Sequence, residues 1–400
     1  GGAVMFSTSL ALIAQEFSGK ERGTALGIWG ATIGGAVAIG PLVGGVLTDA
    51  LGWQSVFYLN VPIGIAAIAV TYAKLRESRD PNATRVDWLG TATFSAALFV
   101  LVLALLRGND EGWGSTLIVS LLAGSALLLA SFVAIERRAK EPMLPLGLFK
   151  RPAFTGVQVA AFAVSGSMFA LFLYITLYLQ NYLGASPFEA GLRYLPVTVM
   201  SFLAAPVAGA LLSRVPARVM MSLGLAGAGG GLLLMSGIQP GDDWTGLLPG
   251  FLLAGAGVGL LNPVIADVAL SVVPKEKSGM ASGINDTFRQ VGIAVGIATW
   301  GAIFLGRGAS EVRDVASGSP AAVGSAPRRL VEAASSGNLD HVPPSSVHAA
   351  REGFLAGFNE ILLIGGILAL AGSLLALLLV REREIEREPA LDALPEPAAA

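Results

Sequence analysis

A few side chains in this sequence could bind or move a proton inside otherwise apolar surroundings. Asp267, Asp286 and Arg289 each interrupt a long run of apolar residues. Carboxylates can take up and release protons, whereas an arginine stays charged and holds such groups in place. Because a charge in hydrocarbon costs roughly 2.5–3.5 kcal/mol, all three are proton-coupling candidates. Asp286 and Arg289, three residues apart on one helix face, fit a structural ion pair equally well. Asp267 lies near the end of its run, where it can also simply reach the membrane interface.

Neutral polar residues in two apolar stretches are candidates for a substrate cavity. Asn262 precedes Pro263 in the middle of one stretch, where proline leaves a backbone carbonyl without its helical partner. The stretch 153–182 carries the other candidates, which are Gln158, Tyr174, Tyr178 and Gln180. Sparse polar groups among aromatic residues suit an apolar or amphipathic cationic ligand. The alternative is that the tyrosines belong to a packed core or to the membrane interface.

The composition excludes several kinds of function. The chain has no cysteine, and its two histidines, His341 and His348, share one polar segment, so a thiolate site and a Ser/His/Asp triad are excluded. No phosphate-binding loop occurs, and the glycine-rich run 224–231 lies inside an apolar stretch with no strand before it. The net charge of −2 points to no nucleic-acid partner. We therefore expect no enzyme, no metal and no cofactor.

Long apolar runs are typical of a membrane protein. Hydrophobic residues make up 54% of the sequence, charged residues 14%, and the mean hydropathy is +0.68. A helix needs roughly 20 apolar residues to cross a bilayer. The runs of this length are 25–48, 55–73, 88–106, 115–135, 153–182, 190–213, 218–237, 246–271, 281–305 and 355–381. The apolar stretch 1–14 is too short to cross and does not begin with Met, so we expect it to be part of a truncated helix.

The distribution of basic residues predicts the orientation. Eighteen Lys and Arg fall on one set of connections and in the tail, whereas the short connections opposite hold only Arg107 and Arg193. Basic residues favour the cytoplasmic side, so we expect a cytoplasmic C-terminus and an extracellular segment 306–354. That segment is expected to be a polar loop with a short helix at 327–336. The charged and Pro/Ala-rich tail, 382–400, is expected to be disordered.

An internal repeat suggests how the chain is organised. Residues 1–45 align with residues 256–300, with GKERGTALG opposite PKEKSGMASG and three small residues at equal spacing after them. Such repeats build transporters whose substrate site lies between two halves near the middle of the membrane. We expect four parts: the remainder of an N-terminal helix bundle at 1–73, a two-helix central insert at 74–152, a six-helix bundle at 153–381 and the tail. Two six-helix bundles and the insert make an expected parent of fourteen helices.

Four stretches have distinctive spacings of glycine, proline and polar residues. They are GIWGATIGGAVAIGPLVGG at 27–45, GWQSVFYLNVPIG at 52–64, YLQNYLGASPFEAGLRYLP at 178–196 and NDTFRQVGIAVG at 285–296. Together they resemble the motifs of the fourteen-helix drug:proton antiporters of the major facilitator superfamily. The chain departs from that pattern at Ala36, where the family has glycine, and at Gln54, where arginine is usual.

The resemblance implies an all-α membrane protein of major facilitator fold, with about ten full transmembrane helices and a partial one. It implies proton-coupled efflux of drugs or other amphipathic small molecules by a monomer in a bacterial plasma membrane. Its partners are then the lipid bilayer, protons and the substrate. Two other functions stay open, which are an exporter dedicated to one endogenous metabolite and a truncated remnant that transports nothing.

The resemblance also assigns a gating role to the span 27–45. The residues of this antiporter motif are Gly27, Ala36, Gly40, Pro41, Gly44 and Gly45. Small residues let neighbouring helices approach closely in a bilayer. We expect this span to pack against the small residues of 204–209 and to form an extracellular seal and hinge. Simple tight packing is the alternative for the glycines.

Overall fold

Every regular element of the described residues is a helix. The computed structural model describes residues 8–10, 12–13, 16–17, 19–74, 87–212, 214–274, 277–316 and 327–385. The first helices are α2 (Gly19–Leu51), α3 (Ser55–Lys74), α4 (Trp88–Glu111) and α5 (Thr116–Glu136). The later ones are α10 (Ala217–Met235), α11 (Leu248–Ser271), α12 (Ser278–Ala316), α13 (Pro327–Ser335) and α14 (Pro344–Leu379). Short 3₁₀ turns, η1 (Leu146–Lys150), η4 (Trp244–Leu247) and η7 (Leu339–His341), lie between them.

Two of the predicted spans are interrupted. One runs from Pro152 to Tyr182 as α6 (Pro152–Val164), the π-turn η2 (Ser165–Phe169), α7 (Ala170–Leu177) and the π-turn η3 (Tyr178–Tyr182). The next consists of α8 (Pro187–Arg193) and α9 (Leu195–Leu211), bent by 43° at their junction. Ser186 caps α8 with a reciprocal bond pattern to Glu189. Wide turns in a helix commonly mark a place where a neighbour inserts or a function is located.

The helices confirm the predicted spans. Within the described residues, eight helices are long and apolar enough to cross a membrane, or nine if α8 and α9 count as one span. The 33-residue α2 covers the predicted span 25–48. The short helix predicted at 327–336 is present as α13.

The structure corrects the expected loop 306–354 at both of its ends. Helix α12 continues to Ala316 and α14 begins at Pro344, so much of this segment is helical. Good helix formers continue past the apolar run, and Arg307 Nη2 lies 2.9 Å from Glu311 Oε2 one turn later. The change to polar residues therefore shows where the apolar run ends, but it does not predict where helix α12 ends.

The expected disorder of the tail 382–400 is also wrong at its beginning. Residues Glu382–Glu384 form a 3₁₀ turn, η8. Glu384 Oε2 accepts a hydrogen bond from the Ala153 N–H at 3.0 Å, and Glu382 Oε1 accepts one from the Arg218 N–H at 3.2 Å. Both carboxylates thus bind unpaired N–H groups at helix N-termini, a favourable place for a negative charge. Residues 386–400 lie outside the described residues.

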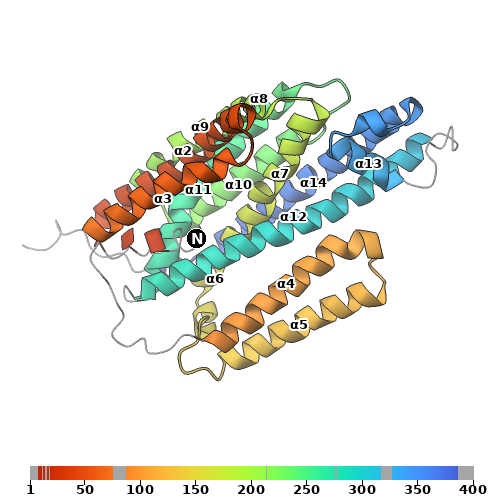
Figure 1. The fold of residues 1–400 in the computed structure, drawn as a ribbon. Helices are drawn as coiled ribbons and strands as arrows, with labels where there is room; N and C mark the ends of the chain where they lie inside the picture. Colours follow the sequence, from red (N-terminus) through yellow and green to blue (C-terminus); the bar gives the residue numbers. More distant parts are fainter. Residues whose placement is uncertain are drawn as a thin grey trace, which may run out of the picture.

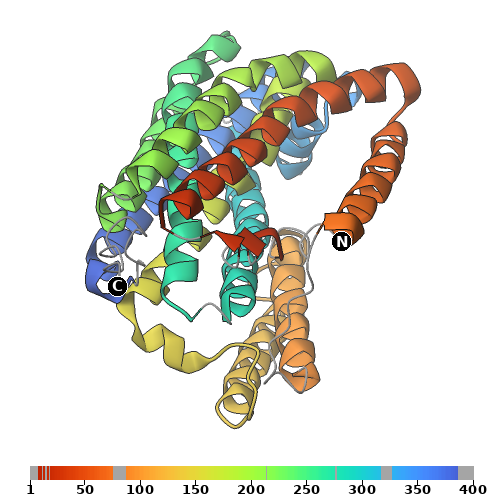
Figure 2. The ribbon, with the colours of Figure 1, turned by 90° about the vertical axis from the view of Figure 1, so that its left-hand side faces the viewer.

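A single hydrophobic core joins the helices of the second half. Its fully buried members come from segments between Ala153 and Ile385 and include Phe154, Tyr178, Phe251 and Phe358. Helix α2 lies along α9 and α11 on one side of this bundle, and the α4–α5 hairpin lies along α12 on another (Figure 1). Helix α3 runs back from the end of α2 apart from the other helices, with Ser55 as its buried residue (Figure 2).

Candidate functional site

A chain of buried side-chain hydrogen bonds links α6, α11 and α12. Arg289 donates from Nη1 to Asn262 Oδ1 at 3.0 Å and from Nε to Asn285 Oδ1 at 3.3 Å. The Asn285 amide in turn donates to Gln158 Oε1 at 3.3 Å. All four side chains are buried, with Arg289 7% exposed and Gln158 fully covered. Three predicted residues therefore meet in one network.

The partners of Arg289 differ from those expected. Its hydrogen bonds to Asn262 and Asn285 go to neutral amide oxygens, and among the described residues no ion pair within 4 Å joins it to Asp286, although that carboxylate is also buried. A buried guanidinium is stabilised when its N–H donors meet acceptors, and each of the two asparagine oxygens accepts from one of these donors. Sequence reasoning missed Asn285 as a site residue. It lies four residues before Arg289 on the same helix face, and that spacing was the available signal.

Close backbone contacts fix the position of α12 beside η2. A Cβ at Gly292 would lie 2.8 Å from the Phe162 carbonyl oxygen, and one at Gly296 would lie 2.6 Å from the Gly166 carbonyl oxygen. The same Gly166 oxygen accepts a hydrogen bond from Trp300 Nε1 at 2.6 Å. The tryptophan thus attaches α12 to the backbone of the π-turn. The glycines thus place Arg289 at a fixed depth between α6 and α11.

Asp267 forms an ion pair with a residue of the first repeat. Arg22 Nε lies 3.9 Å from Asp267 Oδ1, and Arg22 Nη2 donates to the Asp267 carbonyl at 3.4 Å. Both side chains are largely buried, 14% and 11% exposed. The pair joins the first turns of α2 to the last turns of α11. The sequence predicted Asp267 as a candidate but not its partner, because the two residues are 245 positions apart.

The predicted packing of α2 on the second half is present, through a series of small residues. A Cβ at Gly27 would lie 3.5 Å from Pro206 Cα and 3.4 Å from Gly209 Cα. Further along, a Cβ at Gly45 would lie 2.8 Å from Phe188 at the start of α8. Gly30 is equally close to Pro263, at 2.9 Å from its ring. The antiparallel contact therefore runs along much of α2, from the end near Arg22 to the end near α8.

Other residues of the antiporter motif lie outside this contact. No atom of the described residues is within 4 Å of the Cβ position of Gly40 or Gly44, and Ala36 and Gly40 are exposed. The close approach expected at these positions is therefore wrong, because they fall on a different face of α2 from Gly27 and Gly45. The side chain of Pro41 lies outside what the structure describes. The close small-residue contacts of Gly209 with Gly23 and Gly27 also lie toward the predicted cytoplasmic end and not the extracellular end.

The predicted cavity tyrosines belong to the core of the second half. Tyr174 donates to the Ile297 carbonyl at 2.8 Å, and its ring lies 5.7 Å from that of Phe304. Tyr178 stacks on Phe358 with ring centroids 4.9 Å apart. Their surroundings are those of packed core residues, the alternative that the sequence left open. Gln180 is half-buried on η3.

Asn262 also lines a small apolar space where α2 meets the second half. Ile33 closes this space on one side, and Phe169, Phe172 and Val258 form its apolar walls. Thr198, Ser201 and Asn262 supply its polar groups. Asn262 therefore connects this space with Arg289. Few polar groups among aromatic rings is the composition expected of a small-molecule site, but the volume of this space is only about 20 Å³. Ligand pockets have volumes of roughly 300–1,000 Å³, so α2 must move away from the second half before a substrate can enter.

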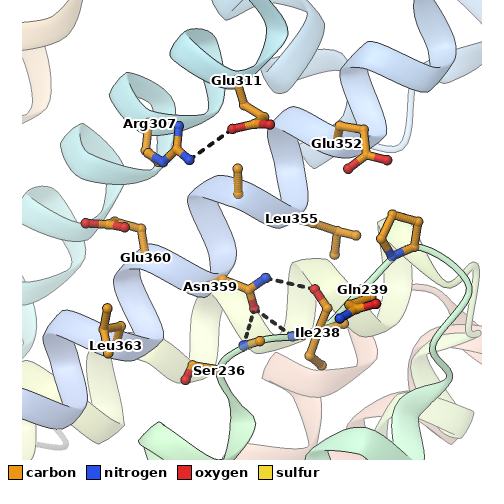
Figure 3. Close-up of a pocket in the computed structure, with 13 residues that line it drawn as sticks. Ser236, Ile238, Gln239, Arg307, Glu311, Glu352, Leu355, Asn359, Glu360 and Leu363 are labelled. Carbon is orange, nitrogen blue, oxygen red and sulfur yellow. Dashed lines mark hydrogen bonds and ion pairs between the residues drawn. The ribbon is translucent and has the colours of Figure 1, made fainter. Parts of the chain in front are cut away.

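A second cavity lies beside α14, and Figure 3 shows the residues that line it. Its volume is about 480 Å³, and it lies between α12, α14 and the connection after α10. Asn359 accepts hydrogen bonds from the Gly237 and Ile238 N–H groups and donates to the Ile238 carbonyl, which holds that connection against α14 (Figure 3). Glu352 also lines the cavity, and its Oε1 lies 3.9 Å from His348 Nε2.

Comparisons with known proteins agree with this architecture. The sequence profile of the Major Facilitator Superfamily matches residues 1–297. The tetracenomycin C resistance and export protein of Streptomyces glaucescens is 31% identical over all of this chain and 76% of its own length. The multidrug resistance protein Stp of Mycobacterium tuberculosis is 35% identical over 76% of this chain and 56% of its own length. The probable actinorhodin transporter of Streptomyces coelicolor is 35% identical over 76% of this chain and 55% of its own length.

The chain thus spans little more than half the length of two of these relatives. The family profile that matches the chain, its helices and its relatives all indicate one family. The members of this family are transporters and not enzymes. The chain belongs to the Major Facilitator Superfamily.

Proposed function

We propose that this protein is a proton-coupled exporter of amphipathic small molecules, of the fourteen-helix drug:proton antiporter type. It would act as a monomer in a bacterial plasma membrane, with the C-terminus in the cytoplasm. The names of its relatives support efflux as the direction of transport, since they are called export, resistance and multidrug resistance proteins. The single observation that carries proton coupling is the ion pair between Asp267 and Arg22.

The pair has the placement that a coupling group needs. Arg22 belongs to the first repeat and Asp267 to the second, so the pair holds together the two parts that must separate during alternating access. Protonation of Asp267 would remove its negative charge and leave Arg22 to interact with the Asp267 carbonyl alone. The contact between α2 and α11 would weaken, and the site would open on that side.

The substrate would bind where α2 meets η2, α9 and α11. Phe169 and Phe172 offer aromatic surface there, and Asn262 supplies a hydrogen bond. Because Asn262 also accepts from Arg289, a ligand that turns this amide would disturb the buried network. Arg289 would then act as a positioning residue, because a change in its bond to Asn262 on ligand binding would shift α12. Asp286 stays a proton-coupling candidate beside it.

Everted membrane vesicles from cells that express the protein can test the coupling. With an acidic lumen, vesicles should accumulate a fluorescent lipophilic cation. Asp267→Asn should lower the gradient-driven rate at least tenfold while the protein stays in the membrane. Asp49→Asn, an exposed carboxylate on α2, is the matched control and should keep the normal rate.

A second arm separates coupling from assembly. The charge exchange Arg22→Asp with Asp267→Arg keeps an ion pair and a titratable carboxylate, so it should keep the normal membrane abundance and more of the gradient-driven transport than Asp267→Asn does. Gradient-driven transport by Asp267→Asn at the normal rate would refute the coupling role. Accumulation of one natural product but of no lipophilic cation would instead identify an exporter dedicated to one metabolite.

A further inference from the structure

Two carboxyl groups face each other at the predicted cytoplasmic end of the α4–α5 hairpin. Asp87 caps α4, and its Oδ1 accepts a hydrogen bond from the Gly90 N–H at 2.8 Å. Glu136 is the last residue of α5, and its Oε2 accepts from the Leu144 N–H at 3.2 Å. Each group therefore has one oxygen bound to the backbone and one oxygen left over.

The remaining oxygens lie together and have no hydrogen-bond donor among the described residues. Asp87 Oδ2 and Glu136 Oε1 are both buried without a partner, and Glu136 is only 4% exposed. The two groups are within hydrogen-bond reach of each other. Both oxygens lie close to Gly90. A Cβ at this position would lie 2.9 Å from Glu136 Oε1 and would collide with Asp87 Oδ2. Two carboxylates in this arrangement cannot both be ionised at low cost, whereas one carboxylic acid can donate to one carboxylate.

Other described charges do not neutralise the pair. The apolar parts of α4 and α5, residues 88–106 and 115–135, contain no charged residue. The charged residues of the segment after α5 are exposed, and they are Arg137, Arg138, Lys140 and Glu141. The residues of α12 that line the cavity beside the hairpin carry no charge, and they are Met280, Gly283, Ile284, Thr287, Phe288, Val291 and Val295. Asp87 is the charged group that acts on Glu136.

The pair also holds one wall of a large apolar cavity. This cavity of about 600 Å³ lies between the hairpin and α12, and its lining includes Phe94, Phe132, Met143 and Leu144. Glu136 binds the backbone of Leu144, and the Thr91 hydroxyl donates to Met143 Sδ at 3.5 Å. The segment Met143–Leu144 is therefore attached to the cavity through the two helix ends that carry the carboxyl pair.

We propose that Asp87 and Glu136 share one proton, and that this proton keeps Met143–Leu144 closed over the cavity between the hairpin and α12. Loss of the proton to the cytoplasm leaves two facing carboxylates, whose repulsion separates the ends of α4 and α5 and releases the segment. This proton-binding site is distinct from Asp267 and Arg22, and it does not depend on the proposed transport function. It would make the hairpin respond to cytoplasmic pH.

Cysteine labelling can test the proposal, because the chain has no native cysteine. In everted vesicles, the labelling rate of Leu144→Cys with an impermeant maleimide is divided by that of Lys140→Cys, an exposed position. The ratio removes the pH dependence of the thiol itself. We expect it to rise at least threefold from acid to alkaline pH. Glu136→Gln and Asp87→Asn, which are neutral and similar in shape, should each give a low ratio at every pH.

Glu141→Gln is the matched control, since it removes a neighbouring but exposed carboxylate, and it should keep the rise. An infrared band of a protonated carboxylic acid in the whole protein should disappear in both Glu136→Gln and Asp87→Asn, even if the labelling rates of a variant are disturbed. A ratio that does not change with pH, or a rise that survives in Glu136→Gln, would overturn the proposal. A ratio that responds to Na⁺ or Mg²⁺ at constant pH would overturn it in favour of a cation site.

Discussion

Replacement of Gly209 by alanine tests whether α2 and α9 depend on backbone contact. The added Cβ would lie 2.7 Å from the Gly23 carbonyl oxygen and 3.0 Å from Gly27 Cα. Both are backbone atoms, so they cannot rotate away, and the helices must separate. Overpacking of this kind costs about 1–3 kcal/mol. Alanine regains up to about 1 kcal/mol of helix propensity, which leaves a net loss of roughly 0–2 kcal/mol.

Gly40→Ala, on α2, is the matched control for Gly209→Ala on α9. In the part of the chain that the structure describes, nothing lies within 4 Å of its Cβ position, so this variant gains the helix propensity without a collision. The difference in free energy of unfolding between the two variants should then be about 1–3 kcal/mol, the overpacking cost alone. Thermal unfolding in detergent, followed by tryptophan fluorescence, measures it as a lower midpoint for Gly209→Ala.

The two midpoints also decide whether the reasoning is right. Equal midpoints would mean that α2 and α9 are not in contact as described. A larger loss for Gly40→Ala would place the important contact at the motif position that the structure leaves open.

Three further outcomes are expected. Single cysteines at Lys140 and Ser336 should react oppositely with an impermeant maleimide in intact cells, with Ser336→Cys labelled; labelling of Lys140→Cys alone would reverse the predicted topology. Arg289→Met should abolish transport and should destabilise the second half by about 1–3 kcal/mol, because buried asparagine oxygens lose their donors; wild-type transport would remove Arg289 from the mechanism. Asn359→Ala should increase proteolysis of the connection after α10, since two N–H groups lose their acceptor; an unchanged cleavage rate would show that the connection is held otherwise.

The sequence by itself determined the class of this protein and the position of its spans. Length and apolarity decide whether a helix can cross a bilayer, and both can be counted along the chain. The same argument predicted Asp267, Asp286 and Arg289 as proton-coupling candidates. A charge in an apolar run costs free energy wherever its partner lies in the sequence. It failed at the end of α12, where helical hydrogen bonds continue after the apolar residues stop.

Only the tertiary structure decided which groups meet. Gly27 and Gly40 belong to one motif, but the direction in which α2 faces places the first against Gly209 and leaves the second without a neighbour. The partners of Asp267 and Arg289 come from other helices, and no spacing in the sequence encodes them.

The carboxyl pair shows the same limit most clearly. In the sequence alone, Asp87 is typical of a residue that caps a helix and Glu136 of a residue at a helix end. Each of them, considered separately, would be expected to be a solvated charge. The antiparallel return of α5 along α4 brings their two unpartnered oxygens together and removes water from both. The proposed sharing of a proton requires that the two carboxyl groups lie within hydrogen-bond reach and are buried. Both conditions arise only when α4 and α5 pack against each other as a hairpin.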